Sequence, residues 1–243
     1  MAGELGGRRV LVTGASAGIG AAVARGLVRG GARVGLLARD GDRLASLVDE
    51  IAGGVPVTCD ITDETAVGEA VDRAAERLGG LDALVNSAGL FTVGSLSDMD
   101  PAAWRAMFEV NVLGLLATTQ AALPHLKQGT SPSVVNVSSM SGRRVPTHQS
   151  GVYSATKFAV HALGDALRME LAGHGIRVTT ISPGMVDTGI AADWPAGEYN
   201  DRFRERLRSD GLAPQSVADA VLHVLGTPPS VNVVEYAVMS INQ

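Results

Sequence analysis

Short apolar runs alternate with segments of helical periodicity along nearly the whole chain of 243 residues. The runs are apolar throughout rather than alternating, which is typical of parallel strands covered on both faces. Strands are expected at Arg9–Thr13, Arg33–Leu37, Val55–Cys59, Ala83–Asn86, Ser133–Ser138, Arg177–Ser182 and Val231–Met239. Helices are expected at Ala17–Arg29, Asp42–Ala52, Glu64–Leu78, Ala102–Lys127, Tyr153–Gly173 and Ser216–Leu225. This alternation predicts an α/β fold, a doubly wound parallel sheet with helices on both faces.

The bulk composition fits one domain with a large core. Hydrophobic residues make up 46% of the chain and charged residues 19%, a balance that disordered chains do not have. No linker rich in Pro, Ser or Gly divides the sequence, so a single domain is expected over residues 1–243. The least regular part, 184–213, is expected to be a substrate-loop excursion from that domain.

Charge and cysteine content narrow the range of partners. The net charge is −5, with no basic stripe for nucleic acid. The single cysteine, Cys59, excludes an internal disulfide and a multi-cysteine zinc site, and a buried thiol is expected there. The apolar stretch after Arg9 is too short for a signal peptide, and no segment approaches the ~18–20 apolar residues of a membrane span. A cytoplasmic protein without a nucleic-acid or membrane partner is therefore expected.

A glycine-rich turn follows the first expected strand and opens the first expected helix. Gly14, Gly18 and Gly20 allow the backbone to turn sharply and to approach a pyrophosphate at the positive N-terminus of the helix. Such a motif alone is a weak signal, since glycines also serve ordinary turns. Here it has the strand–turn–helix context that dinucleotide binding requires, so the turn predicts a dinucleotide site.

The end of the second strand bears on which dinucleotide binds. Asp40 fits the spacing of an acid that would hold the ribose 2′-hydroxyl of NAD, but the apolar run ends at Ala38. Arg39 would then lie beside the ribose, where an arginine grips a 2′-phosphate, while Asp40 or Asp42 caps the next helix. NADP(H) is therefore favoured. The alternative is NAD, with Arg39 in solvent and Asp40 on the ribose.

Tyr153 and Lys157 are four residues apart on an expected helix and therefore share a face. A phenol with a reference pKa of about 10 is a poor acid or base near neutral pH, but a neighbouring ammonium stabilises its anion. A serine at the end of the preceding strand could hydrogen-bond a substrate oxygen, because such folds bind ligands at the carboxyl edge of the sheet. Alone, a Tyr–Lys pair is usually surface decoration; its place behind a dinucleotide turn favours acid–base chemistry.

Over essentially its whole length the sequence resembles the short-chain dehydrogenase/reductase family, in its short, NADP-preferring form. The matching motifs are Thr13-Gly14 with Gly18-Ile19-Gly20, Asp60, Asn86-Ser87-Ala88-Gly89, Asn111, Ser139, Tyr153 with Lys157, and Pro183-Gly184 with Thr188. The resemblance implies a Rossmann fold. It also implies an enzyme, a carbonyl reductase or alcohol dehydrogenase, that transfers hydride between NADP(H) and a ketone or aldehyde and its alcohol, with a tyrosine as general acid/base.

The resemblance also implies a role for each matching position. The catalytic residues would be Asn111, Ser139, Tyr153 and Lys157, with Asn111 holding a water that links Lys157 to solvent as a proton relay. Asp60 would contact the adenine, and Thr188 would orient the nicotinamide carboxamide. The implied cofactor-binding residues are Gly14, Ser16, Gly18, Ile19, Gly20, Arg39, Asp60, Ile61, Asn86, Ala88, Gly89, Tyr153, Lys157 and Thr188.

Two positions depart from the family pattern. Ser87 stands where the family usually has a second asparagine, a small change. Ser139 lies one residue further from Tyr153 than is usual for the catalytic serine. Ser139 is still preferred because Gly142 follows it at the usual Ser-x-x-Gly distance. Ser138 and Ser141 are the alternatives.

The C-terminal run Val231–Met239 lacks the glycine-rich ending that is usual in acyl-carrier-protein reductases of the family. It looks more like the clavulanate dehydrogenase and hydroxy-acid dehydrogenase branch. A carrier-linked β-ketoacyl reductase and a non-catalytic dinucleotide-binding regulator are the alternative functions, although a regulator would be expected to lose Tyr153 or Lys157. The resemblance further suggests a homodimer or homotetramer with Ala102–Lys127 and Tyr153–Gly173 as contact helices.

The remaining candidate residues carry less weight. The five histidines are scattered without the spacing of metal ligands, so no metal site is expected. His148 could contact substrate, because it lies in the loop before Tyr153. Trp194, in the irregular excursion, is either a lid over the substrate or a packing residue. The run Arg202–Arg208 is expected to be the solvated face of a short helix.

Overall fold

Seven parallel strands form one sheet in the computed structural model, which describes residues 5–191, 194 and 197–243. Their order across the sheet is β3-β2-β1-β4-β5-β6-β7. The strands are β1 (Arg9–Thr13), β2 (Arg33–Ala38), β3 (Val55–Thr58), β4 (Ala83–Asn86), β5 (Ser133–Val137), β6 (Arg177–Pro183) and β7 (Glu235–Val238). The order reverses between β1 and β4, where doubly wound sheets open a crevice at their carboxyl edge. The predicted fold is confirmed.

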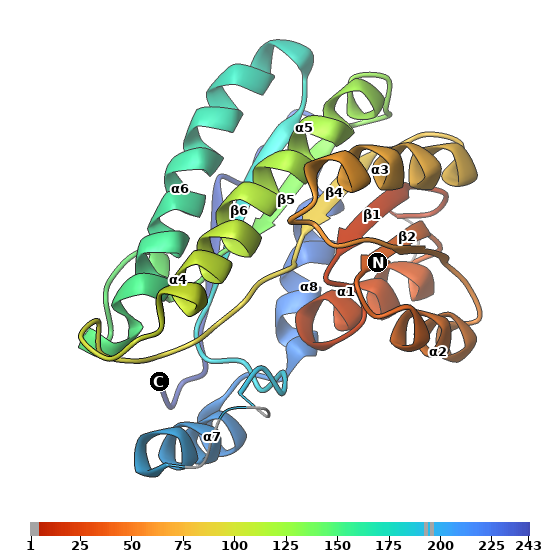
Figure 1. Cartoon of the computed structure of the whole chain (residues 1–243). Helices are drawn as coiled ribbons and strands as arrows, with labels where there is room; N and C mark the ends of the chain where they lie inside the picture. Colours follow the sequence, from red (N-terminus) through yellow and green to blue (C-terminus); the bar gives the residue numbers. More distant parts are fainter. Residues whose placement is uncertain (1–4, 192–193, 195–196) are drawn as a thin grey trace.

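Helices cover both faces of this sheet (Figure 1). One face carries α1 (Gly18–Arg29), α2 (Gly41–Ile51) and α8 (Pro214–Leu225). The other carries α3 (Glu64–Leu78), α4 (Pro101–Phe108), α5 (Gly114–Leu126) and α6 (Gly151–Leu171). A further helix, α7 (Glu198–Asp210), lies outside these two layers, near the C-terminus in Figure 1.

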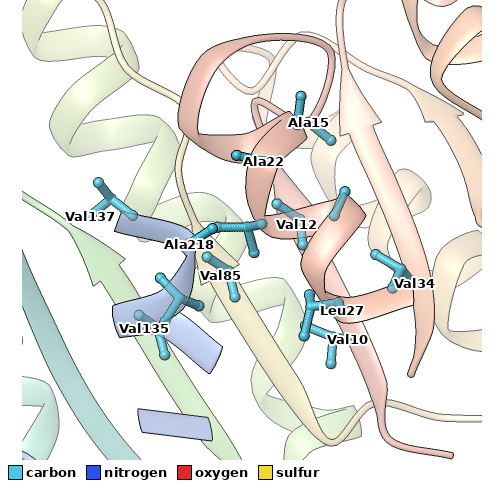
Figure 2. Packing of buried hydrophobic residues seen from close by; sticks show 14 of the residues in the cluster. Val10, Val12, Ala15, Ala22, Leu27, Val34, Val85, Val135, Val137 and Ala218 are labelled. Carbon is cyan, nitrogen blue, oxygen red and sulfur yellow. The ribbon is translucent and has the colours of Figure 1, made fainter. Parts of the chain in front are cut away.

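The strand β1 shows why the runs are apolar on both sides. Val10 and Val12 face the core cluster under α1 and α8, whereas Leu11 between them faces the cluster under α3 and α5. Figure 2 shows the first cluster, in which side chains of β1, β2, β4 and β5 pack against α1 and α8. Full burial of each such valine or leucine contributes roughly 1.5–3 kcal/mol, so both helix layers are fixed to the sheet.

The helix expected at Ala102–Lys127 is interrupted. Between α4 and α5 the chain forms a π-helical turn, Glu109–Leu113, with Asn111 buried in it. Local departures of this kind bulge a helix and recur at functional sites. The π-helical turn directs the polar Asn111 side chain into the interior. Helical periodicity in the sequence does not predict this orientation.

The same stretch corrects another expectation. Pro101–Leu126 spans 26 helical residues and contains an 18-residue window of mean hydropathy 1.3, so by length and composition it could cross a membrane. The expectation that no segment approaches a span was therefore wrong. In this structure 44% of that window is buried, and α5 packs against α3 and β4 as a core helix does.

The last strand is shorter than expected. The run Val231–Met239 forms β7 only over Glu235–Val238. Before β7, the Asn232 side chain accepts from the Val178 nitrogen at 2.8 Å and donates to the Val178 carbonyl oxygen at 3.1 Å. A side chain thus replaces the backbone ladder at this point, which apolar patterning cannot reveal.

The excursion at 184–213 leaves the sheet after β6 and returns at α8. It contains α7, and a parallel bridge between Val186 and Leu212 closes its base. Residues 192, 193, 195 and 196 of the expected excursion lie outside the described residues. The excursion therefore lies beyond the carboxyl edge of the sheet, where ligands of such folds bind.

Candidate active site

The glycine turn lies between β1 and α1 at the carboxyl edge. Gly14 and Gly18 have φ values of 64° and 53°, in the left-handed region that favours glycine. A Cβ on Gly14 would lie 2.7 Å from the Ala88 Cα, and one on Gly18 would lie 2.9 Å from the Thr188 Cβ. A Cβ on Gly20 would lie 2.2 Å from the Gly14 carbonyl oxygen. Only glycines let the turn lie directly against the segments that follow β4 and β6.

The N-terminus of α1 is free to receive an anion. Its N-cap residue, Ala17, makes no side-chain cap, and no acidic residue lies in its first turn. By contrast, Asp40, Asp63 and Asp100 cap α2, α3 and α4 by accepting from backbone nitrogens of the first turn. The first N–H groups of a helix need an acceptor and carry a partial positive charge. The glycine cradle and the uncapped helix therefore fit a pyrophosphate group.

The end of β2 matches the expected arrangement. The strand ends at Ala38, and Asp40 caps α2 through the Arg43 nitrogen at 3.0 Å. Arg39 is exposed over 72% of its side chain, and its guanidinium lies 3.9 Å from the Asp60 carboxylate. Because the Asp40 carboxylate caps α2, the exposed Arg39 guanidinium is the charged group at this end of the crevice that is better placed to bind a ligand.

Three further residues expected to bind the cofactor, Asp60, Ile61 and Asn86, differ in their burial and in their hydrogen bonds. Asp60 accepts from the Thr62 nitrogen and hydroxyl at 3.0 and 2.9 Å, and Ile61 is buried against the start of α5. Asn86 is buried and donates to Thr119 and Asn136 at 2.9 Å. The side chains of Ile61 and Asn86 thus face the interior, so any contact they make with a cofactor would come from their backbone.

Tyr153 and Lys157 lie together on the first turns of α6. The Lys157 Nζ lies 5.8 Å from the centroid of the Tyr153 ring and donates to the Val137 carbonyl at 3.0 Å. No carboxylate among the described residues pairs with this buried ammonium, and burial lowers the pKa of Lys157 to about 8. Burial raises the pKa of Tyr153 to about 12, and a hydrogen bond with Ser139 acts in the opposite direction.

Asn111 approaches the same group from the π-helical turn. Its amide brackets Leu90, accepting from the nitrogen at 2.7 Å and donating to the carbonyl at 2.9 Å, and also donates to the Thr156 hydroxyl at 3.1 Å. A Cβ on Gly89 would lie 3.5 Å from the Asn111 Oδ1 and 3.8 Å from the Lys157 Nζ. Asn111 and Lys157 therefore flank the glycine that follows β4, which brings two expected catalytic residues together.

The three candidate serines differ in what they contact. Ser139 accepts from the Ser141 nitrogen at 3.0 Å and hydrogen-bonds Tyr153. Ser138 is buried, and its hydroxyl donates to the Lys157 carbonyl at 3.2 Å. Ser141 has no hydrogen bond to Tyr153 in the described part of the chain, and all three serines line the cavity described below. The geometry favours Ser139.

A polar cluster that the sequence did not indicate lies behind Ser139. His161 lies 3.2 Å from the Ser182 hydroxyl, which donates to Glu235 at 2.8 Å. Arg143 donates to the other Glu235 oxygen at 2.5 Å. Burial lowers the pKa of His161, whereas a hydrogen bond from its ring to the Ser139 backbone raises it. The cluster ties the serine loop to β6 and β7.

A cavity of about 520 Å³ joins these elements. Ile19 of the glycine turn, Thr188, Ser139 and Tyr153 line it together. Gln243 closes one side, because its amide bonds both backbone groups of Met185 and the carbonyl of Asp210. Most of the remaining wall is apolar and comes from Phe91, Met140, Pro146, Met185, Val186, Phe203, Leu207 and Met239. The volume is that of a small-molecule site.

The run Arg202–Arg208 lies on the helix α7, and Arg202, Glu205, Arg206 and Arg208 are exposed as expected, but the helix also has a face toward the cavity. Tyr199, Arg202, Phe203, Arg206 and Leu207 share one face of α7, and that face lines the cavity. The spacing of four between Phe203 and Leu207 indicates this face, although charged residues surround both positions in the sequence.

The structure also shows where Trp194 and His148 lie relative to the cavity. The Trp194 ring stacks on the Phe203 ring with 5.3 Å between the centroids, and its centroid lies 5.2 Å from that of Phe91. The Phe91 centroid in turn lies 4.5 Å from the centroid of the Tyr153 ring. Trp194 thus packs behind the cavity wall instead of lining the cavity. His148 is exposed and is not among the described residues that line it.

The described residues contain no group of three or more His, Cys, Asp or Glu side chains placed to hold a metal ion. Cys59 is buried, as expected, and burial raises the pKa of its thiol. Neither feature bears on the chemistry of the cavity.

Comparison with known proteins places the chain in a family. The family model for short chain dehydrogenases matches residues 8–198. An uncharacterized oxidoreductase of Staphylococcus aureus is 41% identical over 230 residues, which cover 94% of this chain and 95% of the relative. The chain therefore belongs to the short-chain dehydrogenase/reductase family and is an oxidoreductase of that family.

Solved structures of similar fold contain a nicotinamide dinucleotide. An alcohol dehydrogenase of Thermococcus sibiricus, complexed with 5-hydroxy-NADP, is 31% identical with a TM-score of 0.86 and covers 97% of both chains. A short chain dehydrogenase of Burkholderia cenocepacia in complex with NADP is 35% identical with a TM-score of 0.87, over 97% of this chain and 98% of that one. A closed form of serine dehydrogenase complexed with NADP+ is 30% identical with a TM-score of 0.88, over 96% and 95%.

Proposed function

We propose that this chain catalyses the reversible reduction of a ketone or aldehyde to an alcohol with NADP(H). The observation that carries the proposal is the pairing of Tyr153 with the buried ammonium of Lys157, which lies 5.8 Å from the centroid of its ring. Tyr153 hydrogen-bonds Ser139, and both line a cavity together with Ile19 of the glycine turn. Proton donor, cation and anion cradle thus meet at one edge of the sheet. These are the parts that hydride transfer to a carbonyl requires.

The side chains have separable tasks in the reduction. Bound reduced nicotinamide supplies the hydride that adds to the carbonyl carbon. Ser139 and Tyr153 hydrogen-bond the carbonyl oxygen, and the Tyr153 hydroxyl then donates its proton to that oxygen. A pKa near 12 keeps the phenol protonated until the oxygen becomes basic. Lys157 stabilises the phenolate that remains, and Asn111, which lies beside the same glycine as Lys157, would hold a water through which the replacement proton arrives from solvent.

The preference for NADP over NAD rests on Arg39. Its guanidinium is exposed at the end of β2, while the nearest candidate acid, Asp40, is engaged as a helix cap. A 2′-phosphate would be attracted by Arg39 and would meet no free carboxylate from Asp40. Three similar solved structures hold NADP or a derivative of it, which supports the same choice.

The assembly and compartment belong to the same proposal. Phe108, Leu113, Phe158 and Met169 are large apolar side chains exposed on α4, the π-helical turn and α6. Exposed apolar surface of this kind commonly lies in subunit contacts. We propose a cytoplasmic homodimer or homotetramer joined through these helices, and light scattering on the purified protein would measure its mass in solution.

Turnover on chemically defined substrates tests the function. The purified protein is given NADPH or NADH with a panel of small ketones and aldehydes, and with a carrier-bound β-ketoacyl substrate. The proposal expects alcohol formation from small ketones and a larger kcat/KM with NADPH than with NADH. Reduction of the carrier-bound substrate alone would favour the carrier-linked reductase, whereas NADPH binding without turnover of any substrate would favour a regulator.

A further inference from the structure

The charged side chains that line the cavity, among the described residues, are all arginines. Among the described residues that line it are three arginines, Arg144, Arg202 and Arg206, and no aspartate or glutamate. The chain as a whole carries a net charge of −5, so this local excess of positive charge runs against the average of the molecule. A concave surface that concentrates one sign of charge attracts ligands of the opposite sign.

The three arginines come from two separate parts of the chain. Arg144 lies in the loop that follows Ser139, whereas Arg202 and Arg206 are four residues apart on α7 and share its cavity-lining face. Phe203 and Leu207 lie beside them on that face. The cavity therefore combines guanidinium groups with apolar contacts, although the segments that supply them are far apart in sequence.

Neighbouring arginines show that these three are not simply structural. Arg143 is engaged by Glu235 at 2.5 Å, and Arg204 donates to the carbonyl oxygens of Ala191 and Trp194. Both of those guanidinium groups therefore tie segments of the protein together. Arg144, next to Arg143, lines the cavity instead, as do Arg202 and Arg206, two residues before and after Arg204.

The cavity-lining arginines make no strong interactions with the other described residues of the protein. Arg144 has no side-chain partner in the described part of the chain. Arg206 lies 3.9 Å from Asp210, and Arg202 pairs with Glu198 at 2.8 Å, but these two arginines are 62% and 75% exposed. Ion pairs this exposed contribute little to stability, so an anionic ligand competes with them readily.

We infer that the substrate carries an anionic group, a carboxylate or a phosphate, joined to its reacting carbonyl through an apolar body; the inference rests on the proposed reductase function. The carbonyl binds at Tyr153 and Ser139, and the anion binds at Arg144, Arg202 and Arg206. Guanidinium groups suit this task, because their planar donor sets match carboxylate and phosphate oxygens. The apolar wall favours a hydrocarbon spacer between the carbonyl and the anion over a polyhydroxylated spacer.

Matched substrates test the inference. Wild-type protein is assayed with NADPH and 5-oxohexanoate, its neutral methyl ester, and 5-oxohexyl phosphate. The same assays are run on Arg144→Gln, Arg202→Gln, Arg206→Gln and the triple variant, with Arg208→Gln as the control from the same helix but outside the cavity lining. We expect wild type to prefer an anionic substrate over the ester by about tenfold or more in kcat/KM. The acid and phosphate arms distinguish the two anions.

The variants should lose the preference through KM for the anionic substrate, with kcat and the ester unchanged and with Arg208→Gln like wild type. Equal use of acid, phosphate and ester by wild type would overturn the inference, as would a preference that survives the triple variant. A weaker NADPH affinity in the triple variant, with the substrate preference intact, would assign the arginines to the cofactor and would also overturn it.

Binding separates this inference from the proposed function. Calorimetry on Tyr153→Phe with NADP+ compares 5-oxohexanoate, 5-oxohexyl phosphate and the ester without turnover. Tighter binding of an anion, with no reduction by wild type, would support an anion site at the arginines but refute the reductase function. Reduction of the ester with no anion preference would do the reverse. Failure of both anions to bind would contradict the inference directly.

Discussion

The two edges of the sheet are built on opposite principles. At the amino edge, Asp82 before β4 accepts from the Arg9 nitrogen, Nε and Nη2 at 2.9, 2.9 and 2.6 Å, and from the Thr130 nitrogen at 2.7 Å. Arg177, the first residue of β6, is buried and donates to Thr227 and Ser133. Most donors and acceptors of these charged groups are therefore paired within the protein, although the Arg177 Nε has no partner in the described part of the chain.

At the carboxyl edge, polar groups are left without such partners. The Lys157 ammonium is buried with one carbonyl acceptor, α1 lacks a side-chain cap, and Tyr153 opens onto an apolar cavity. Burial of an unpaired charge costs stability, whereas a paired and hydrogen-bonded one is tolerated. The comparison indicates that the amino edge holds the sheet together and that the carboxyl edge accepts a stability cost in order to react with a ligand.

Removing the buried Lys157 ammonium should have the largest effect, because it should lower activity and raise stability at the carboxyl edge. Lys157→Met is expected to lower kcat by roughly 10³-fold, because the tyrosinate loses its cation. The same change should raise the free energy of unfolding by about 1 kcal/mol or more. Steady-state kinetics and urea unfolding measure the two effects. Lys127→Met, at the exposed end of α5, is the matched control and should change neither.

The reverse pattern is expected at the amino edge. Asp82→Asn should lower the free energy of unfolding by about 3 kcal/mol, because the carboxylate is only 5% exposed and Arg9 loses its partner. Its kcat/KM at a temperature where the variant is folded should equal that of wild type. Glu50→Gln breaks the equally short but exposed pair with Arg25 and should have little effect. A loss of activity without a loss of stability in Asp82→Asn would break the comparison.

The pH dependence of stability should separate the edges in opposite directions. Burial alone raises the pKa of Asp82, but its hydrogen bonds with Arg9 and Thr130 bring that pKa below the ordinary value. Its stabilising effect is therefore complete above an unfolded pKa of about 3.9 and is lost as the pH falls below it. For Lys157, with a pKa of about 8 when folded, destabilisation is complete below pH 8 and is relieved as the pH rises to about 10.4.

Denaturation of wild type and both variants across pH measures these windows. The difference between wild type and Asp82→Asn should shrink at acid pH, and the difference between wild type and Lys157→Met should shrink above pH 8. Differences that stay constant across both windows would mean that neither charge is responsible.

Cofactor choice should show the smallest effect, since Arg39 is exposed. Arg39→Ala is expected to lower the ratio of kcat/KM for NADPH over NADH by about tenfold, without a change in unfolding. Arg43→Ala removes a neighbouring exposed arginine that pairs with Asp40, and serves as the control. An unchanged ratio in Arg39→Ala would move the source of any NADP preference to another residue.

The sequence predicted those features that depend on local spacing. The bounds of β1, β4 and α3 agree with the runs of apolar residues, because burial on two faces leaves an unbroken apolar strand. The glycine turn and the spacing between Tyr153 and Lys157 are likewise short-range patterns. They could be interpreted without knowing where the rest of the chain lies.

Features that depend on long-range contacts could not be predicted. The cavity joins Phe91, Arg144 and Gln243, whose sequence separation carries no pattern. Glu235 behind Ser139 comes from the last strand, and Asn232 replaces a ladder by its side chain. The charges of α7 concealed an apolar face, and Asn111 is directed inward by a π-helical turn that periodicity does not foresee.

The central claim, that Tyr153 protonates a carbonyl that receives hydride at this edge, is tested most directly by isotope transfer. Wild type and Tyr153→Phe are mixed with 5-oxohexanoate and its methyl ester and with NADPH deuterated at one or the other C4 position, and the alcohol is examined by mass spectrometry and NMR. Wild type should place one deuterium on the carbinol carbon from one of the two cofactors. Tyr153→Phe should bind NADPH as tightly but transfer the label at least ~10²-fold more slowly. Transfer at the wild-type rate by Tyr153→Phe, or NADPH oxidation without label in the alcohol, would contradict the account.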